Sequence, residues 1–473
     1  MIVRHPIING KKLVGETVAH DVINPYDSSV IDRVAYASLA QMQSAVEAAD
    51  RVFHKEKLTA SERSQILANA SKLLAERKEE IVRTITAESG KPITYSRVEV
   101  DRAIFTIAAS AEAAKTADDI LPVDTMGAPN AIGKQVGVRY FPAGPVAAIT
   151  PFNFPLNLVV HKVAPAIACG CPVVLKPAPQ TPLTSFLLSD IFQEAGLPPG
   201  WLNVVPCEND VAEQLVTDER IKVVSFTGSA AVGWKLKSLV PKKKVTLELG
   251  GNGGVIVDEV KDWDKLISSL CTAAFYYAGQ VCISLQRLYV QKNIYNELLK
   301  RFIEAASKLG VGDPTLESTV VGPMISEQAA KKAWGWIESA IAAGGKKHIG
   351  EFREPNFITP TVMTDVPQDC ELSCEEAFAP VVIFEPYDSF SEAIEKVNST
   401  RYGLQVGVYS SDNAKIAEAY EKLEVGGVII NDTNTFRIDA MPYGGVKDSG
   451  FGREGVRYAM QEMCEVKVIV KAK

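Results

Sequence analysis

Histidine and cysteine, the residues that most often mark metal centres and disulfide scaffolds, are scarce in this sequence. There are 5 His and 8 Cys among 473 residues. Cys169 with Cys171, and Cys370 with Cys374, lack a second Cys or His pair at zinc spacing, so we expect small buried thiols and no bound metal. The cysteines are also too few for a disulfide scaffold of this length, and they favour a reducing compartment with one or two chemically special thiols.

Long apolar runs and basic tracts are absent as well. Arg4, His5 and Pro6 interrupt the N-terminus before the apolar core of a signal peptide can form, and no later segment is apolar for long enough to cross a bilayer. Lys and Arg total 50 against 57 Asp and Glu, a net charge of -7 that disfavours nucleic acid or an anionic membrane as a partner. We therefore expect a cytoplasmic enzyme or binding protein with no nucleic acid and no membrane partner.

Alternating apolar and helical segments indicate the fold class. The length of 473 residues exceeds what one hydrophobic core usually serves, so two or three domains are expected. Helical periodicity covers 39–86 and 101–117, and from residue 137 short apolar runs alternate with helix-length segments. Such alternation predicts a doubly wound α/β domain, a parallel sheet covered by helices on both faces. Its expected strands are 146–150, 173–176, 202–205, 223–227 and 255–257.

The same pattern repeats in the second half and predicts a second α/β domain. Residues 118–130 are expected to form a loop or a short extended arm. The last segment, 464–470, alternates as a strand with nothing after it to pair with, so another subunit could cover its edge and we expect an oligomer. The strands expected in this half are 288–290, 381–384, 406–409 and 428–431, between helices at 293–308, 326–343, 390–397 and 412–421.

Three turns follow predicted strands, where open α/β sheets bind their ligands. The turn 150–155 carries Asn153, whose amide either donates a hydrogen bond to a developing oxyanion or caps a helix. Lys176 follows the second strand, where a nucleotide phosphate or ribose can lie. The small-residue turn 226–233 either brings backbone N–H groups to a pyrophosphate or is merely a tight connection.

Two further segments contain a carboxylate and a thiol in apolar surroundings. Glu248 stands between leucines before a glycine pair, where loss of solvation would raise its pKa into the range of a general base; the alternative is a paired structural acid. Cys282 follows a glycine turn and is either an inert core thiol or a nucleophile activated by local dipoles. Together with Asn153 they supply the groups for attack on a carbonyl, oxyanion binding and thioester hydrolysis.

Taken in order, these motifs resemble the aldehyde dehydrogenase superfamily over essentially the whole chain. The matching segments are PFNFP (151–155), ACGCPVVLKP (168–177), FTGS (226–229), LELGG (247–251), GQVC (279–282), EEAFAP (375–380) and PYGGVKDSG (442–450). The resemblance implies two doubly wound parallel-sheet domains plus a small β oligomerisation element. It implies a cofactor domain at 1–121 and 141–247, a catalytic domain at 248–449, and a bridging element at 122–140 and 450–473, in a homodimer or homotetramer.

The resemblance also implies roles for individual residues. Cys282 is expected to be the nucleophile, Glu248 the general base, and Asn153, with the backbone N–H of Cys282, the oxyanion hole. NAD or NADP is the expected cofactor, with Lys176 at the adenine ribose, Ser229 at the pyrophosphate, and Glu376 and Phe378 at the nicotinamide ribose and ring. The remaining expected cofactor contacts are Ile149, Thr150, Pro151, Phe152, Pro179, Gly228, Gly233 and Leu249.

Three positions, compared with the family pattern, bear on the cofactor and on the reaction. Pro179 stands where many NAD-preferring relatives have a Glu, so both NAD and NADP stay open. Glu248, which coenzyme A-acylating members generally lack, favours hydrolysis of the thioester. Val281 stands where members specific for glyceraldehyde 3-phosphate often have Arg. This difference disfavours glyceraldehyde 3-phosphate as the substrate but does not exclude it.

The segments 153–162 and 436–443 look like the branch that acts on lactaldehyde, phosphonoacetaldehyde, sulfolactaldehyde and related small polar aldehydes. Asn153, Asn157 and His161 lie at i, i+4 and i+8, so one helix face would carry all three towards the pocket. Our hypothesis is that a hydroxyl or anionic group of the substrate is bound by Arg102, Asn157, His161 and Arg437. The alternative is a helix-packing histidine with arginines that are paired at the surface.

Overall fold

The first α/β unit of the computed structural model is built on an eight-stranded sheet. The structure describes residues 3–115, 119–121 and 129–472. The strand order is β24-β12-β11-β8-β9-β10-β2-β3. Five central strands are parallel: β8 (Val146–Ile149), β9 (Val173–Lys176), β10 (Leu202–Val204), β11 (Val223–Thr227) and β12 (Lys244–Glu248). Short antiparallel strands extend both edges: β2 (Ile7–Ile8), β3 (Lys11–Lys12) and β24 (Gly450–Phe451).

Helices cover both faces of this sheet, as the alternation of its side chains requires. Val146 and Ala148 of β8 pack into one core with α2, α4, α5 and α6, whereas Ala147 and Ile149 pack into another with α1, α7 and α8. Because successive strand residues point to opposite faces, two cores are the expected result. The helices are α1 (Leu39–Lys55), α2 (Ala60–Glu76), α3 (Lys78–Ser89), α4 (Ile93–Ala113), α5 (Asn157–Cys169), α6 (Leu183–Glu194), α7 (Asn209–Thr217), α8 (Ala230–Leu239) and α15 (Val456–Glu462).

The second α/β unit has a seven-stranded sheet in the order β15-β18-β19-β14-β13-β21-β22. All neighbouring strands are parallel except β15 against β18. The strands are β13 (Gly253–Val257), β14 (Leu285–Gln291), β15 (Lys346–Ile349), β18 (Thr361–Thr364), β19 (Val381–Tyr387), β21 (Gln405–Tyr409) and β22 (Gly427–Ile430). The helices are α9 (Trp263–Phe275), α10 (Lys292–Ala306), α11 (Glu327–Ala342), α12 (Glu371–Cys374), α13 (Phe390–Asn398) and α14 (Asn413–Lys422). The predicted doubly wound fold is confirmed.

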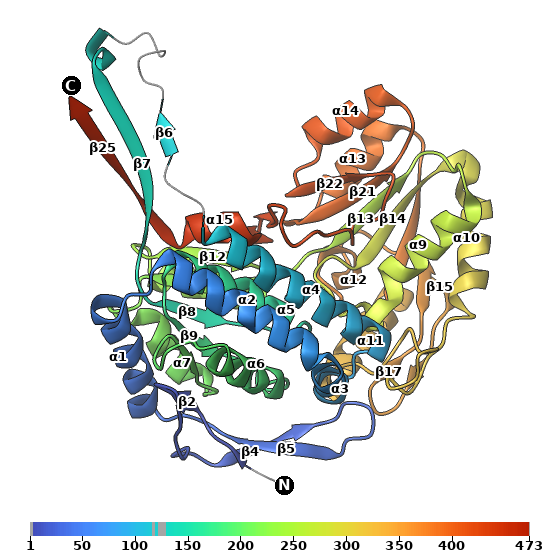
Figure 1. The fold of residues 1–473 in the computed structure, drawn as a ribbon. Coiled ribbons are helices and arrows are strands. Elements are labelled where there is room, and N and C mark those ends of the chain that lie inside the picture. The colour runs from blue at the N-terminus through green and yellow to red at the C-terminus, as the bar shows by residue number, and fades with distance from the viewer. Residues whose placement is uncertain (1–2, 116–118, 122–128, 473) are drawn as a thin grey trace.

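A three-stranded arm projects from the first unit and ends near the C-terminus (Figure 1). It consists of β25 (Cys464–Ala472), β7 (Lys134–Pro142) and β6 (Asp119–Leu121), in that order. Two predictions fall partly on residues that the structure does not describe. Residues 118 and 122–128 of the predicted loop or arm at 118–130, and residues 122–128 of the predicted bridging segment at 122–140, lie outside the described residues. Within the predicted segment 450–473, β24 extends the first sheet and α15 packs on α5 and α4, so β25 is the part that joins the arm.

The N-terminal strands were not anticipated from the sequence. β1 (Val3–Arg4), β5 (Val30–Ala35) and β4 (Ala19–Ile23) form a separate three-stranded sheet. These strands carry polar residues on exposed faces and are short, so they lack the apolar runs that identify central strands. In the part of the chain that the structure describes, no helix has the length and apolar character needed to span a membrane.

Candidate active site

The turn that carries Cys282 has a strained backbone. Tyr277 and Ala278 have φ values of 50° and 53°, and Gly279 follows with 68°. A Cβ at Gly279 would lie 2.2 Å from the carbonyl oxygen of Ala379, so only glycine fits where this turn meets the segment after Phe378. Cys282 is partly exposed, although the residues on both sides are buried. Strained backbone of this kind clusters at functional sites, which makes Cys282 the candidate reactive thiol.

The charges around Cys282 disfavour its thiolate overall. Burial raises the pKa of Cys282 to about 11, and the carboxylates of Glu376 and Glu248 act in the same direction. A hydrogen bond with Tyr443 and the positive charge of Arg437 oppose this shift. The Tyr443 hydroxyl oxygen lies 3.3 Å from the sulfur. Free Cys282 is therefore mostly a neutral thiol at neutral pH.

Glu248 ends β12 as a buried acid without partners. Both carboxylate oxygens are buried, and neither accepts a hydrogen bond from the described residues. A Cβ at Gly444 would lie 2.9 Å from Glu248 Oε1, so this glycine leaves the carboxylate its room. Burial raises the pKa of Glu248 well above its usual value, and the negative charge of Glu454 adds to the shift. An unpaired buried acid of this kind is a signature of general-base sites, because a structural acid is normally hydrogen-bonded.

Asn153 follows β8 and is hydrogen-bonded to the turn that carries Cys282. Its Nδ2 donates one hydrogen bond to the carbonyl of Gln280 at 2.9 Å, and the side chain is buried. The second N–H of the same amide remains for a ligand, since an amide nitrogen has two hydrogens. The Asn153 side chain is thus joined directly, by one hydrogen bond, to the turn that bears Cys282.

The predicted substrate residues converge on an acid that the sequence did not indicate, Asp439. Arg102 forms a bidentate ion pair with Asp439, at 2.6 and 3.0 Å. Asn157 Nδ2 donates to Asp439 at 3.2 Å, and His161 Nε2 lies 2.8 Å from the same oxygen. Burial alone would raise the pKa of Asp439, but hydrogen bonds from His161 and Arg102 keep it far below its usual value. Asp439 is therefore ionised and holds these side chains in place.

Arg437 belongs to a second buried group of charges beside Asp439. Its guanidinium is 3.4 Å from Glu454 and lies over the Tyr443 ring, 3.7 Å from the centroid. Lys162 pairs with Glu454 at 2.8 Å and donates to the Ser225 hydroxyl at 3.1 Å. Burial would raise the pKa of Glu454, but Lys162, His161 and Arg437 lower it to about 2. The Arg437 Nε is buried and has no hydrogen-bond partner among the described residues, although it lies 3.8 Å from Asp439 Oδ1, within ion-pair distance.

The sequence analysis missed four of these functional residues: Lys162, Asp439, Tyr443 and Glu454. Lys162 follows His161 in a helix whose residues are all buried, so a charged side chain there was a usable signal. Asp439 and Tyr443 lie within the quoted segment 436–443. Glu454 carried no local signal, because it is recognisable only through its partner 292 residues earlier.

The residues predicted at the cofactor fit a dinucleotide. Lys176, at the end of β9, is buried, and its ammonium group forms no ion pair with any carboxylate among the described residues. Ser229 precedes α8 but does not cap it, and the nearby Thr227 hydroxyl is buried without a partner. These groups, with the open N-terminus of α8, suit a pyrophosphate and a ribose. A Cβ at Gly233 would lie 2.4 Å from Leu249, so this glycine allows α8 to pack closely on the loop after β12.

The nicotinamide end of the predicted site is formed by a buried acid and two aromatic rings. Glu376 accepts a hydrogen bond from the Gly251 N–H at 3.1 Å, and burial raises its pKa to about 7 against that bond. Phe378 has a strained φ of 49°, and its ring packs edge-on against Phe152 at 5.8 Å between centroids. Phe152 follows Ile149, Thr150 and Pro151 at the carboxyl end of β8. Pro179 is exposed beyond β9, and Gly228 opens the turn after β11.

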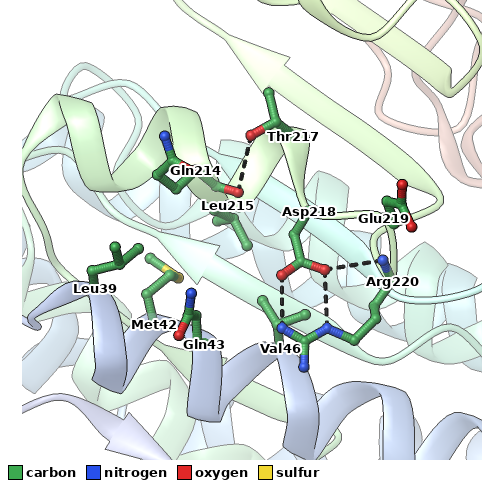
Figure 2. Close-up of a pocket in the computed structure, with 10 residues that line it drawn as sticks. All are labelled: Leu39, Met42, Gln43, Val46, Gln214, Leu215, Thr217, Asp218, Glu219 and Arg220. Carbon is green, nitrogen blue, oxygen red and sulfur yellow. Dashed lines mark hydrogen bonds and ion pairs between the residues drawn. The ribbon is translucent and has the colours of Figure 1, made fainter.

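A surface pocket between α1 and α7 lies apart from these residues. Figure 2 shows that Arg220 and Asp218 in this pocket pair with each other, at 2.7 Å. None of the residues that line it belongs to the predicted site, and we assign it no role. Among the described residues, no cluster of His, Cys, Asp and Glu side chains is arranged to hold a metal ion. All eight cysteines lie in the described part and are free thiols.

The geometry defines a class of protein. A partly exposed thiol, an unpaired buried acid and an amide meet beside a dinucleotide fold, which is the arrangement of a thiol-dependent oxidoreductase that acts on carbonyl groups.

Comparison with known proteins identifies the family. A sequence model of the aldehyde dehydrogenase family matches residues 14–469. A 3-sulfolactaldehyde dehydrogenase of Priestia aryabhattai is 40% identical over 459 residues, 96% of each chain. A lactaldehyde dehydrogenase of Methanocaldococcus jannaschii is 39% identical over 473 residues, 98% of this chain and 100% of the relative. The chain therefore belongs to the aldehyde dehydrogenase family and is an oxidoreductase, as its motifs predicted.

Solved structures agree with this assignment. Aldehyde dehydrogenase 21 from Physcomitrella patens, in complex with the reaction product succinate, has a TM-score of 0.96 at 43% identity, covering 99% of this chain and 98% of that one. A glyceraldehyde-3-phosphate dehydrogenase from Methanocaldococcus jannaschii, complexed with NADP, has a TM-score of 0.91 at 38% identity, covering 96% and 99%.

Proposed function

We propose that this enzyme oxidises an aldehyde to a carboxylic acid through a thioester on Cys282, which water activated by Glu248 hydrolyses. The observation that carries the proposal is Glu248 itself, a buried acid whose two oxygens lack partners among the described residues. Such a group has acceptor capacity for a water molecule and a raised pKa that suits proton removal near neutral pH.

The other residues supply the remaining groups for this reaction. The Cys282 sulfur attacks the aldehyde carbon, and the free N–H of Asn153 with the backbone N–H of Cys282 stabilises the negative oxygen that forms. NAD or NADP, when bound, supplies the hydride acceptor. Lys176, Ser229 and Glu376 would hold its adenine ribose, pyrophosphate and nicotinamide ribose. Glu248 then removes a proton from the water that attacks the thioester carbon.

The Glu248→Gln variant tests the hydrolytic role. The amide cannot take a proton, so the acyl group should accumulate on Cys282 and steady-state turnover should fall by about 100-fold or more. Mass spectrometry of protein mixed with aldehyde and oxidised cofactor should show the acyl mass on the peptide that contains Cys282. In the wild type, hydrolysis should rise with pH as Glu248 loses its proton, whereas in the variant this rise should disappear.

The exposed Glu395 offers a matched Glu→Gln control, which should turn over like the wild type. Unchanged turnover in Glu248→Gln, or an adduct on another cysteine, would contradict the proposal. Formation of acyl-coenzyme A with a large rate gain on adding coenzyme A would instead support an acylating enzyme.

We further propose a small polar or anionic aldehyde as the substrate. The support is the buried group of charges around Asp439 and Glu454, where the three cations Arg102, Arg437 and Lys162 lie against these two carboxylates. The excess favours an anionic or hydroxylated group beside Arg437, whose Nε has no hydrogen-bond partner among the described residues. Sulfolactaldehyde and lactaldehyde dehydrogenases among the relatives point the same way.

A substrate panel checks this proposal. We expect kcat/KM for a three-carbon aldehyde carrying a hydroxyl or an anionic group to exceed that for propanal by about tenfold or more, the value of one charge-assisted hydrogen bond. Equal values for propanal and for the charged aldehydes would exclude it. Running the panel with NAD and with NADP also decides the cofactor, since Pro179 presents no carboxylate to repel a 2′-phosphate.

We also propose that the chain forms a homodimer or homotetramer through its projecting arm. The support is the uncovered strand β25, whose apolar side chains Val466, Val468 and Val470 are each more than half exposed. A long exposed edge strand of this kind is normally covered by another chain.

A further inference from the structure

Tyr443 occupies a fixed position beside the reacting sulfur. Its backbone exchanges two hydrogen bonds with Glu454: the Tyr443 N–H donates at 3.0 Å and its carbonyl accepts at 2.7 Å. The side chain is only 4% exposed and packs in one cluster with Tyr277, Val281 and Cys282. The hydroxyl oxygen is 3.3 Å from the Cys282 sulfur, within hydrogen-bond distance for sulfur. Both ends of the contact are therefore held by packed structure.

We propose that Tyr443 is a further catalytic residue, whose hydroxyl donates a hydrogen bond to the Cys282 thiolate and stabilises it for attack on the aldehyde. This inference rests on the proposed role of Cys282 as the nucleophile. It assigns to Tyr443 the stabilisation of the sulfur before bond formation, whereas Asn153 acts on the oxygen afterwards.

The hydroxyl is suited to donate rather than to accept. Burial, together with the negative charge of a Cys282 thiolate, raises the pKa of Tyr443 well above its usual value, so the phenol keeps its proton at every working pH. The Arg437 guanidinium covers the ring face at 3.7 Å from the centroid, and a cation there draws electron density from the ring and strengthens the O–H as a donor. Tyr443 thus transmits part of the Arg437 charge to the sulfur.

Other groups near Cys282 disfavour its thiolate form. Glu376, from the segment after α12, and Glu248, from β12, both raise the pKa of Cys282, and burial raises it further. Tyr276, from the turn before Cys282, is a partly buried phenol that forms no hydrogen bond to the sulfur among the described residues. Among these groups, Tyr443 and Arg437 favour the thiolate.

The size of the effect follows from thiol chemistry. With the pKa of Cys282 at about 11, the thiolate is a small fraction at pH 8. Lowering the pKa by one unit increases that fraction about tenfold, while the intrinsic nucleophilicity falls by a factor of about 3 for a Brønsted coefficient near 0.5. The net gain in rate is about threefold per unit.

In the step itself, the thiol gives its proton to water and the thiolate keeps the hydrogen bond from Tyr443. The sulfur electron pair then forms the C–S bond, and the carbonyl π pair moves to the oxygen beside Asn153. Tyr443 retains its proton throughout, and its hydrogen bond weakens once the sulfur is bonded and neutral.

Alkylation of Cys282 by iodoacetamide tests the proposal without requiring turnover. The rate at the Cys282 peptide is followed by mass spectrometry between pH 7 and 9.5 in the wild type, Tyr443→Phe and Tyr276→Phe. We expect Tyr443→Phe to react about threefold more slowly across this range, because loss of the donor raises the pKa of the thiol by about one unit. Tyr276→Phe, which removes a hydroxyl from the same cluster, should react like the wild type.

Equal alkylation rates in Tyr443→Phe and the wild type would overturn the proposal, and so would an equal slowing in both variants, since that indicates looser packing. Unfolding midpoints and the KM for the dinucleotide should be unchanged in Tyr443→Phe. Failure of the proposed function is recognised separately, because fully alkylated Cys282 would then leave aldehyde oxidation intact.

Discussion

At the scale of single residues, the glycine pair Gly250 and Gly251 controls the position of the Glu376 carboxylate, which we propose binds the cofactor. A Cβ at Gly250 would lie 2.4 Å from Glu376 Oε2, and one at Gly251 would lie 2.5 Å from the carbonyl oxygen of Cys282. The backbone N–H of Gly251 meanwhile donates to Glu376 at 3.1 Å. The two glycines therefore let the Glu376 carboxylate and the nucleophile turn approach the same short segment of backbone.

Gly250→Ala should weaken dinucleotide binding without unfolding the protein. The added methyl displaces the end of a flexible side chain, so the cost in stability is small, but the Glu376 carboxylate moves away from the ribose position. We expect the KM for the dinucleotide to rise about tenfold, the value of one charge-assisted hydrogen bond. Steady-state kinetics and a thermal unfolding curve measure the two effects.

Gly254→Ala is the matched control, because a Cβ there meets Val397 at an ordinary 3.5 Å. It should leave the KM for the dinucleotide at the wild-type value. A Gly250→Ala enzyme with the wild-type KM would show that Glu376 does not bind the cofactor.

At the scale of elements, a buried ion pair fixes the start of α5. Lys91, between α3 and α4, forms an ion pair with Glu99, and both side chains are fully buried. Glu99 also accepts the N–H groups of Leu156 and Asn157, at 2.9 and 3.0 Å, where α5 begins. The Lys91 ammonium lies 3.7 Å from the centroid of the Phe154 ring. The pair therefore holds the turn that carries Asn153 against α4.

Lys91→Met should destabilise the fold by about 3–5 kcal/mol, because it leaves the Glu99 carboxylate buried without its counter-ion. Activity should fall as well, since the turn bearing Asn153 loses its support. Urea unfolding followed by fluorescence gives the free energy of unfolding. Lys72→Met, which breaks the exposed pair with Glu76 at 3.8 Å, should change stability little. If both variants unfold at the same urea concentration, the buried pair has no structural role.

At the scale of the whole molecule, the arm has one apolar face. In the β25–β7 register, Val466 pairs with Tyr140, Val468 with Val138, and Val470 with Val136. Side chains of paired residues lie on the same face of a sheet, so these six form one stripe. The arm projects from the body of the protein (Figure 1), and Val466, Val468 and Val470 of β25 are each more than half exposed.

Val468→Lys should therefore shift the protein from an oligomer to a monomer. A charge in the middle of the apolar stripe cannot be buried against a second copy without a large desolvation cost. Size-exclusion chromatography with light scattering at micromolar concentration measures the mass of the wild type and the variant. Ile469→Lys, the same kind of change on the other face, should keep the wild-type mass. A monomeric wild type would exclude the proposed assembly.

Much of this protein was predictable from local sequence patterns. Most predicted strands and helices lie within a few residues of an element in the structure, because short apolar runs and helical periodicity reflect the local requirement to bury one face. The sheet assignment was wrong for 255–257, which was expected in the first sheet but belongs to β13 of the second, and β12 and β18 were not predicted. Cys282, Glu248 and Asn153 were predicted as candidate site residues in the same way, since each lies at or near the end of a buried strand.

Other features were decided by the tertiary structure alone. Asp439 pairs with Arg102 across 337 residues, and Glu454 pairs with Lys162 across 292. Neither Asp439 nor Glu454 has a local signature, because the sequence around a charged loop residue is the same whether the side chain is solvated or buried in an ion pair. The contact between Tyr443 and Cys282 likewise joins residues 161 positions apart in the sequence. The sequence by itself thus determined the elements and the chemical groups, while long-range packing determined which charges surround them.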